Sequence, residues 1–383
     1  MNSSGATSRS IRSRMEDVVA PAPPRFVIGL LILFGAAQFF VDPEPGLPEF
    51  LFPALLLFIS QRALTAPAHL LLFAGNVAAI LIEFLTFGTA TWSVVSLYLT
   101  LTSVALLSIM TRYDFYPCAR ALLIGGAVGA GITLAVLATP FADQAYRYGI
   151  RFTGFFKDPN VTAPTALFFA VALLAIYGRW RWLAVIPFVV FAISISRATY
   201  LAAAVGLVYA IASRSRILAV FGALILAAGA LFLDQIIGLV DSLFQLLGRQ
   251  GLVNSYDDDR SSNWMQLVSL AWERGVPLGP GFSEANGMST HSTYLRLLVE
   301  QGAIVLVMFV AALWICLRTA ASLAIRTAIV CLAVNATVID ATHWRVLFVA
   351  IAIALAWRHH VLPDLRAVRR GPPVRRRSSR LRT

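Results

Sequence analysis

The chain has 383 residues, of which 58% are hydrophobic and 13% are charged, and its mean hydropathy is +0.76. A soluble globular domain carries roughly twice this share of charge, so the composition excludes an ordinary soluble protein. The net charge of +12 is almost entirely arginine, because Lys157 is the only lysine. In so apolar a chain this charge indicates orientation in a membrane rather than nucleic-acid binding.

Apolar stretches recur from Phe26 to Trp357, many of them near the ~20 residues that a helix needs to cross a bilayer. Leu, Val, Ala and Phe occupy all faces of these stretches, which favours helices over the alternating pattern of a membrane β-barrel. We therefore predict an all-α, polytopic membrane protein with about twelve transmembrane helices. The predicted spans are 26–41, 50–61, 67–86, 91–110, 120–138, 161–178, 182–196, 198–213, 217–233, 293–317, 327–339 and 346–357. No cleavable signal peptide is expected, because the polar N-terminal segment leads directly into the first span.

The basic residues divide unequally between the two sides of this arrangement. Twenty-two of the 31 fall on the side of the N-terminus and nine on the other side. Positive-inside bias then predicts cytoplasmic termini in a multi-pass protein of the bacterial inner membrane. Residues 1–25 form a cytoplasmic tail, 26–357 the transmembrane domain, and 358–383 a basic cytoplasmic tail. This last segment is too polar to fold alone, and it acts as a topology anchor or rests on anionic headgroups.

Two segments on the periplasmic side are longer than turns, 139–160 and 234–290. Apolar residues at helical spacing over 236–247 predict a helix that lies in the outer interface. A second short helix is predicted over Ser262–Arg274, with Ser261 or Ser262 as its N-cap.

The sequence predicts no metal site and no cofactor. Asp257, Asp258 and Asp259 are consecutive and lack further ligands, so a solvated turn is the preferred interpretation. The three cysteines lie in or beside apolar spans without metal-ligand spacing, and we interpret them as reduced packing residues. They are Cys118, Cys316 and Cys331.

Nine basic residues on the periplasmic side are unusual, since positive-inside bias disfavours them there. The first cluster runs from Arg151 to Asn160, where Pro159 favours an extended Asp158 and Asn160 is a good N-cap. One interpretation is a capped helix start. The other is that Arg151 and Lys157 approach an anionic group at the headgroup level.

Arg197 follows Ser194-Ile195-Ser196 at the outer end of the seventh span, with almost no loop before the next span. A cation at this depth requires partners or water, so Arg197 either snorkels to the interface or binds phosphate through paired hydrogen bonds. Arg260, beside the three acids, is either a surface residue or a second phosphate contact.

The segment Thr290-His291-Ser292-Thr293-Tyr294-Leu295-Arg296 opens the tenth span. With Ser289 or Thr290 as N-cap, His291 lies in the first turn, where the helix dipole favours a neutral imidazole that can accept a proton. The alternative is an ordinary interfacial histidine. Arg296 and Glu300 are four residues apart, which predicts an ion pair within the helix. Between the last two spans, Asp340, His343 and Arg345 either fill the turn or line the same cavity.

These motifs resemble those of the O-antigen ligase and polymerase superfamily, membrane proteins that transfer lipid-linked bacterial glycans. The resemblance is carried by GFFKDPN (154–160), SISRA (194–198), Arg260 and Trp264 before PLGPGF (277–282), and THSTYLRLLVEQG (290–302). The family pattern has Asn after the histidine, where this chain has Ser292.

The resemblance implies a metal-independent, GT-C-like glycosyltransferase that uses an undecaprenyl-diphosphate-linked glycan donor. Arg197 and Arg260 would then stabilise the diphosphate leaving group, and His291 would bind phosphate or activate the acceptor hydroxyl. The candidate substrate-binding residues are Arg151, Lys157, Asp158, Asn160 and Tyr294. Glycan or lipid A-core acceptors and membrane lipids are the expected partners, and nucleic acid is not.

The alternative function is a transporter or flippase for polysaccharide or lipid-linked glycan. It is motivated by charges at membrane depth, including Glu83 in the third span. No internal repeat supports it, and the candidate residues are concentrated on one face. Ligase and polymerase chemistry share the donor and differ in the acceptor, and the compact outer loop slightly favours a ligase.

Overall fold

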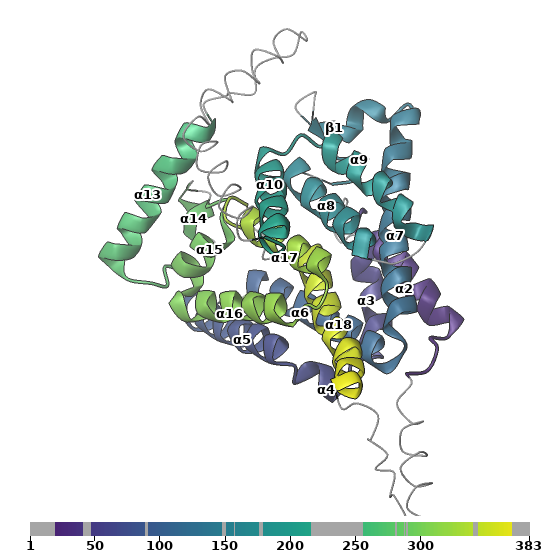
Figure 1. Ribbon diagram of the computed structural model, residues 1–383. Helices are drawn as coiled ribbons and strands as arrows, with labels where there is room; N and C mark the ends of the chain where they lie inside the picture. Colours follow the sequence, from purple (N-terminus) through teal and green to yellow (C-terminus); the bar gives the residue numbers. More distant parts are fainter. Residues whose placement is uncertain are drawn as a thin grey trace, which may run out of the picture.

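The computed structural model describes residues 20–40, 47–88, 91–147, 151–156, 158–175, 179–215, 256–279, 282–286, 288, 290–339 and 344–369. This part of the chain is mostly helical, as predicted (Figure 1). The helices up to the middle of the chain are α2 (Arg25–Ala37), α3 (Leu47–Leu56), α4 (Gln61–Leu64), α5 (Pro67–Phe87), α6 (Thr91–Arg112), α7 (Phe115–Ala135), η2 (Val136–Ala138), η3 (Ala142–Ala145), α8 (Pro159–Ala175), η4 (Arg179–Ala184), α9 (Val185–Ile193) and α10 (Arg197–Ala212). The later ones are α13 (Tyr256–Arg274), α14 (Phe282–Ala285), α15 (Thr293–Arg296), the π-turn η5 (Leu297–Gln301), α16 (Ala303–Thr319), α17 (Leu323–Asn335) and α18 (Arg345–Arg369).

Three helical segments are long and apolar enough to cross a membrane: Pro67–Leu85, Ser93–Arg112 and Phe115–Ala138. Eight shorter apolar helices accompany them, and together these elements overlap eleven of the twelve predicted spans. The ninth predicted span, 217–233, lies outside the described residues, as does the predicted interfacial helix at 236–247.

Helix α18 lies at the centre of the bundle. Its residues 346–357 are all buried, and it packs against α6, α16 and α17. A helix that is apolar on every face is suited to this position. The helical backbone of α18 continues beyond Trp357 to Arg369, so the predicted basic tail begins within this helix.

Helices α2 and α7 approach so closely that only glycine fits at several contacts. A Cβ atom added at Gly35 would lie 2.1 Å from the Leu122 carbonyl oxygen, and one added at Gly125 would lie 2.1 Å from that of Ile32. Small residues permit such close packing between apolar helices, where dispersion contacts replace the hydrophobic effect as the source of stability. The three cysteines are free and buried, as predicted.

The segment after α7 forms η2, η3 and a two-stranded antiparallel sheet of β1 (Tyr146–Arg147) and β2 (Arg151–Phe152). Helix α13 begins at Tyr256, so the predicted start at Ser262 and the predicted N-caps are wrong. The three aspartates at 257–259 belong to the first turn of this helix rather than to a separate turn.

Candidate functional site

The start of α8 brings together three residues of the first predicted cluster. The backbone N–H of Asn160 donates to Asp158 Oδ1 at 2.8 Å, and Arg151 Nη2 on β2 donates to Asn160 Oδ1 at 2.9 Å. The prediction of Asn160 as N-cap is therefore wrong, because Asp158 accepts the first-turn N–H and Pro159 occupies the first helical position. Proline suits that position since it has no N–H to satisfy. Lys157 lies outside the described residues.

Asn160 also connects this cluster with the second one. Ser196 Oγ donates to Asn160 Oδ1 at 2.9 Å, although the two residues are 36 positions apart. Ile195 adopts a positive φ of 48° and lies in the three-residue segment 194–196 that joins α9 to α10, in agreement with the predicted junction with almost no loop. Arg197 is consequently the first residue of α10, and the placement of its side chain lies outside the structural description.

Two buried residues that the sequence analysis did not single out extend this network. Thr199 Oγ1 donates to Ser196 Oγ at 3.0 Å, and Asn335 Nδ2, at the end of α17, donates to Thr199 Oγ1 at 3.0 Å. Ser196, Thr199 and Asn335 have no exposed surface. Asn335 was recognisable as a polar residue inside an apolar helix, but its partner on α10 was not.

The end of α17 also holds the segment that contains the fourth motif. The backbone N–H of Thr293 donates to the carbonyl oxygen of Ala336 at 2.9 Å, and Thr293 Oγ1 donates to that of Ile339 at 3.0 Å. The hydroxyl of Tyr294 donates to the carbonyl oxygen of Ala333 at 2.9 Å. Tyr294 thus uses its hydroxyl proton to pack α15 on α17, and a contact with substrate stays a prediction.

His291 precedes α15 instead of lying in its first turn, which corrects the predicted helix start. Ser292 is the N-cap, and its side chain accepts a hydrogen bond from the backbone N–H of Leu295. Serine is among the strongest N-cap residues, which suits Ser292 to this position. His291 is half-buried and has a positive φ of 41°, a conformation that is uncommon outside glycine and occurs at functional sites.

Helix α13 joins the site beside His291. The indole Nε1 of Trp264 donates to the carbonyl oxygen of Thr290. Below it, Leu267 is completely buried and packs with Met288 and Val299. Arg260 lies one helical turn before Trp264 on α13, and only its backbone is described.

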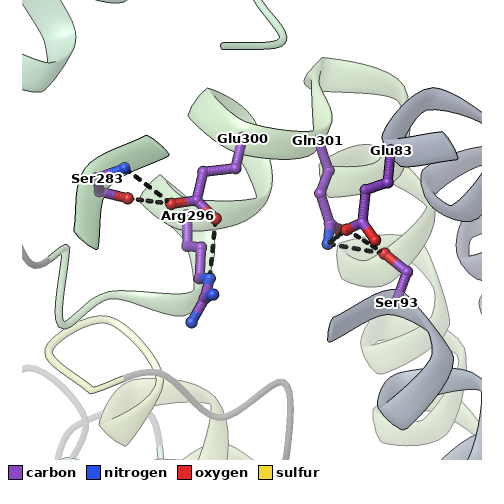
Figure 2. A network of polar contacts seen from close by, with 6 residues as sticks. All are labelled: Glu83, Ser93, Ser283, Arg296, Glu300 and Gln301. Atoms are coloured by element: carbon purple, nitrogen blue, oxygen red, sulfur yellow. Dashed lines mark hydrogen bonds and ion pairs between the residues drawn. The ribbon is translucent and has the colours of Figure 1, made fainter. Parts of the chain in front are cut away.

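A second polar network borders this region (Figure 2). Arg296 Nε pairs with Glu300 Oε2 at 3.1 Å, which confirms the predicted ion pair, and Ser283 donates its hydroxyl and backbone N–H to Glu300 Oε1. Gln301 Nε2 donates to Glu83 Oε1 at 3.2 Å, and the Ser93 hydroxyl donates to the same oxygen. The π-turn η5 therefore links the His291 segment to the ends of α5 and α6.

Within the described residues, Arg345 contacts neither network. Its Nε donates to Glu49 Oε1 at 2.6 Å and so joins the start of α18 to the start of α3. Asp340 and His343 lie outside the described residues.

These contacts unite segments that are distant in sequence. Together they form a continuous set of contacts at one end of the helix bundle, which we call the site end. The site end consists of the start of α8, the junction of α9 with α10, the end of α17, the His291 segment and α13. In Figure 1, α13, α14 and α15 lie together beside the bundle, and α10 lies next to α17.

No family model matches the sequence. No curated protein gives a match either.

Proposed function

We propose that the protein is a membrane glycosyltransferase that moves a glycan from an undecaprenyl-diphosphate-linked donor to a sugar hydroxyl at the periplasmic face. The observation that carries this proposal is the meeting of all four motif segments at the site end. Four hydrogen bonds join these segments: Asn160–Ser196, Asn335–Thr199, Thr293–Ala336 and Trp264–Thr290. Unrelated motifs would have no reason to converge on one end of a helix bundle.

The backbone around Arg197 favours an anionic ligand. Ser196 occupies the N-cap position of α10, yet its hydroxyl makes no capping hydrogen bond because it is used between Asn160 and Thr199. The Ser196 side chain therefore does not cap the first-turn N–H groups of α10, and the positive end of the helix dipole attracts negative charge. Arg197 at the first position of this helix adds a full positive charge that is suited to bind phosphate.

In the proposed reaction, the oxygen of the acceptor hydroxyl attacks the anomeric carbon of the donor. A new glycosidic bond forms while the bond from that carbon to the phosphate oxygen breaks. Undecaprenyl diphosphate leaves with the bonding electrons, and Arg197 and Arg260 stabilise its negative charge in a site with little water. His291 accepts the acceptor proton, or it binds the phosphate directly.

The membrane arrangement that accompanies this proposal has twelve spans, a GT-C-like fold and both termini in the cytoplasm. It places the site end at the outer headgroup level, where the diphosphate of a lipid-linked donor lies. The apolar helices below give the polyprenyl chain lateral access from the bilayer. The acceptor is either lipid A core, for a ligase, or another lipid-linked repeat, for a polymerase.

The direct test replaces Arg197 or His291 with alanine in a strain that depends on this protein. We expect loss of long-chain glycan, with unchanged amounts of protein in the membrane. Arg214→Ala is the matched control, because Arg214 is exposed just beyond the opposite end of α10.

Normal glycan in both Arg197→Ala and His291→Ala would reject the proposal. Transport of the glycan lipid by purified protein without a new glycosidic bond would favour the flippase instead. In a deletion strain, loss of all core-attached chains would indicate a ligase, and single-repeat product a polymerase.

A further inference from the structure

We propose that Thr199 and Asn335 are positioning residues that turn the side-chain amide of Asn160 so that its N–H groups face a phosphoryl oxygen of the lipid-linked donor. This inference rests on the proposed function, because it assigns the ligand of Asn160 within that site. It adds two residues outside all four sequence motifs.

The direction of every hydrogen bond in the network follows from Arg151. A guanidinium can only donate, so the atom of Asn160 that faces Arg151 Nη2 at 2.9 Å is the amide oxygen. Ser196 Oγ lies 2.9 Å from the same oxygen and must also donate to it. The single hydroxyl proton of Ser196 is then used, and its oxygen can only accept from Thr199 Oγ1 at 3.0 Å.

The same reasoning continues to the far end of the network. Thr199 has used its proton toward Ser196, so it must accept from the group that lies 3.0 Å away on α17. That group is the amide nitrogen of Asn335. The side-chain oxygen of Asn335 is buried and has no partner within the part of the chain that the structure describes. Arg151 therefore fixes a single polarity along five side chains, and the amide nitrogen of Asn335 completes it as the donor at the far end.

This polarity determines what Asn160 can offer to a ligand. Both neighbours, Arg151 and Ser196, donate to its amide oxygen, which leaves the Nδ2 group as the free half of the side chain. Among the described residues Nδ2 has no hydrogen-bond partner, and Asn160 is only partly buried. An N–H donor requires an acceptor, and phosphoryl oxygens only accept at neutral pH. The position of Asn160, joined to the residue before Arg197, places this donor at the same end of α10 that favours an anion.

Packing alone does not account for the composition of this network. Thr199 and Asn335 have no exposed surface and lie where α10 packs against α17. Valine and leucine have nearly the same shapes and would fill this interface without burying polar atoms, whose burial is unfavourable unless they are hydrogen-bonded. The hydroxyl and amide are therefore best explained by the orientation that they impose on Ser196 and Asn160.

The experiment compares Thr199→Val, which removes the hydroxyl and keeps the shape, with Thr199→Ser, which keeps the hydroxyl. The readout is binding of undecaprenyl diphosphate to the purified full-length protein, together with kcat and KM for glycan transfer from the lipid-linked donor. We expect Thr199→Val to weaken binding and raise the KM about tenfold, since a hydrogen bond to a charged oxygen is misaligned. Thr199→Ser should stay within about twofold of the wild type in both measurements.

A double-mutant cycle separates positioning from simple loss of structure. In an Asn160→Ala background, Thr199→Val should cause no further loss of binding, because the group that it orients is absent. An undiminished effect in that background, or equal binding by the Val and Ser variants, would overturn the inference. If Thr199→Val does not fold, Asn335→Leu replaces it in the same cycle.

The two proposals fail in different ways. Wild-type protein that binds undecaprenyl diphosphate but forms no glycosidic bond would reject the glycosyltransferase, and weaker binding by Thr199→Val would still support the positioning role. Glycan transfer by a wild type whose Thr199→Val variant behaves like Thr199→Ser would reject only the positioning role. Wild-type protein that neither binds nor transfers would overturn both.

Discussion

The indole nitrogen of Trp264 donates a hydrogen bond to the backbone carbonyl of Thr290, the residue immediately before His291. This contact joins α13 to a segment in which His291 has a positive φ and Ser292 caps the next helix. The position of His291 therefore depends on α13 as well as on α17.

Trp264→Phe tests this dependence because it keeps the aromatic bulk and removes only the N–H. We expect about fivefold slower glycan transfer, corresponding to the ~1 kcal/mol net value of one hydrogen bond. Trp272→Phe is the control, since Trp272 lies two turns further along the same helix and is 90% exposed. Equal rates for both variants would mean that α13 does not position the His291 segment.

The apolar stretches and the breaks between them predicted much of this fold from the sequence. Apolar stretches marked eleven helices of the described bundle, and the short break between the seventh and eighth predicted spans marked the junction with almost no loop before Arg197. The Arg296–Glu300 pair followed from spacing alone, because residues four apart lie on one face of a helix.

Capping was harder to predict, since several adjacent residues could each serve as the cap. The N-cap of α8 is Asp158 rather than Asn160, and that of α15 is Ser292 rather than Thr290. Contacts with other elements, rather than local preference, decide which residue caps each helix. Asn160 was unavailable because Arg151 and Ser196 use its oxygen. Thr199 and Asn335 stayed hidden for the same reason, as their importance depends on a helix pairing that no local pattern encodes.

The close approach of α2 and α7 predicts a sharp difference between two glycines of α2. Gly35→Ala would bring a Cβ to 2.1 Å from the Leu122 carbonyl oxygen, so the backbones must separate, and we expect a loss of about 1–3 kcal/mol in stability. Gly29→Ala meets nothing within 4 Å and should be neutral or stabilising, because alanine is the better helix former. Thermal unfolding of the two variants in detergent gives the comparison. A Gly35→Ala variant as stable as Gly29→Ala would contradict the tight α2–α7 contact.

The buried Arg296–Glu300 pair predicts that one substitution is more harmful than two. Glu300→Gln removes a buried negative charge beside the Arg296 cation, whose side chain is only 7% exposed, and we expect a loss of about 3–5 kcal/mol in stability. Adding Arg296→Met removes the buried cation as well, while glutamine can still accept from Ser283, so stability should be largely recovered. Glu273→Gln on the exposed end of α13 controls for the substitution itself. A double variant no more stable than Glu300→Gln would show that the charge pair is not the source of the effect.

The proposed topology requires an odd number of membrane crossings between Ser213, just after α10, and Ser269 on α13. The two exposed serines are suited to cysteine labelling, because Cys118, Cys316 and Cys331 are buried and should give little background. In spheroplasts, a membrane-impermeant maleimide should label Ser269→Cys at once and Ser213→Cys only after lysis.

The ninth predicted span, 217–233, would supply the crossing between these two serines, and it lies in a part of the chain that the structure does not describe. Equal labelling of both cysteines before lysis would put the two ends of this stretch on the same side. Arg260 on α13 and Arg197 at the far end of α10 would then face opposite sides of the bilayer, and no single diphosphate could contact both.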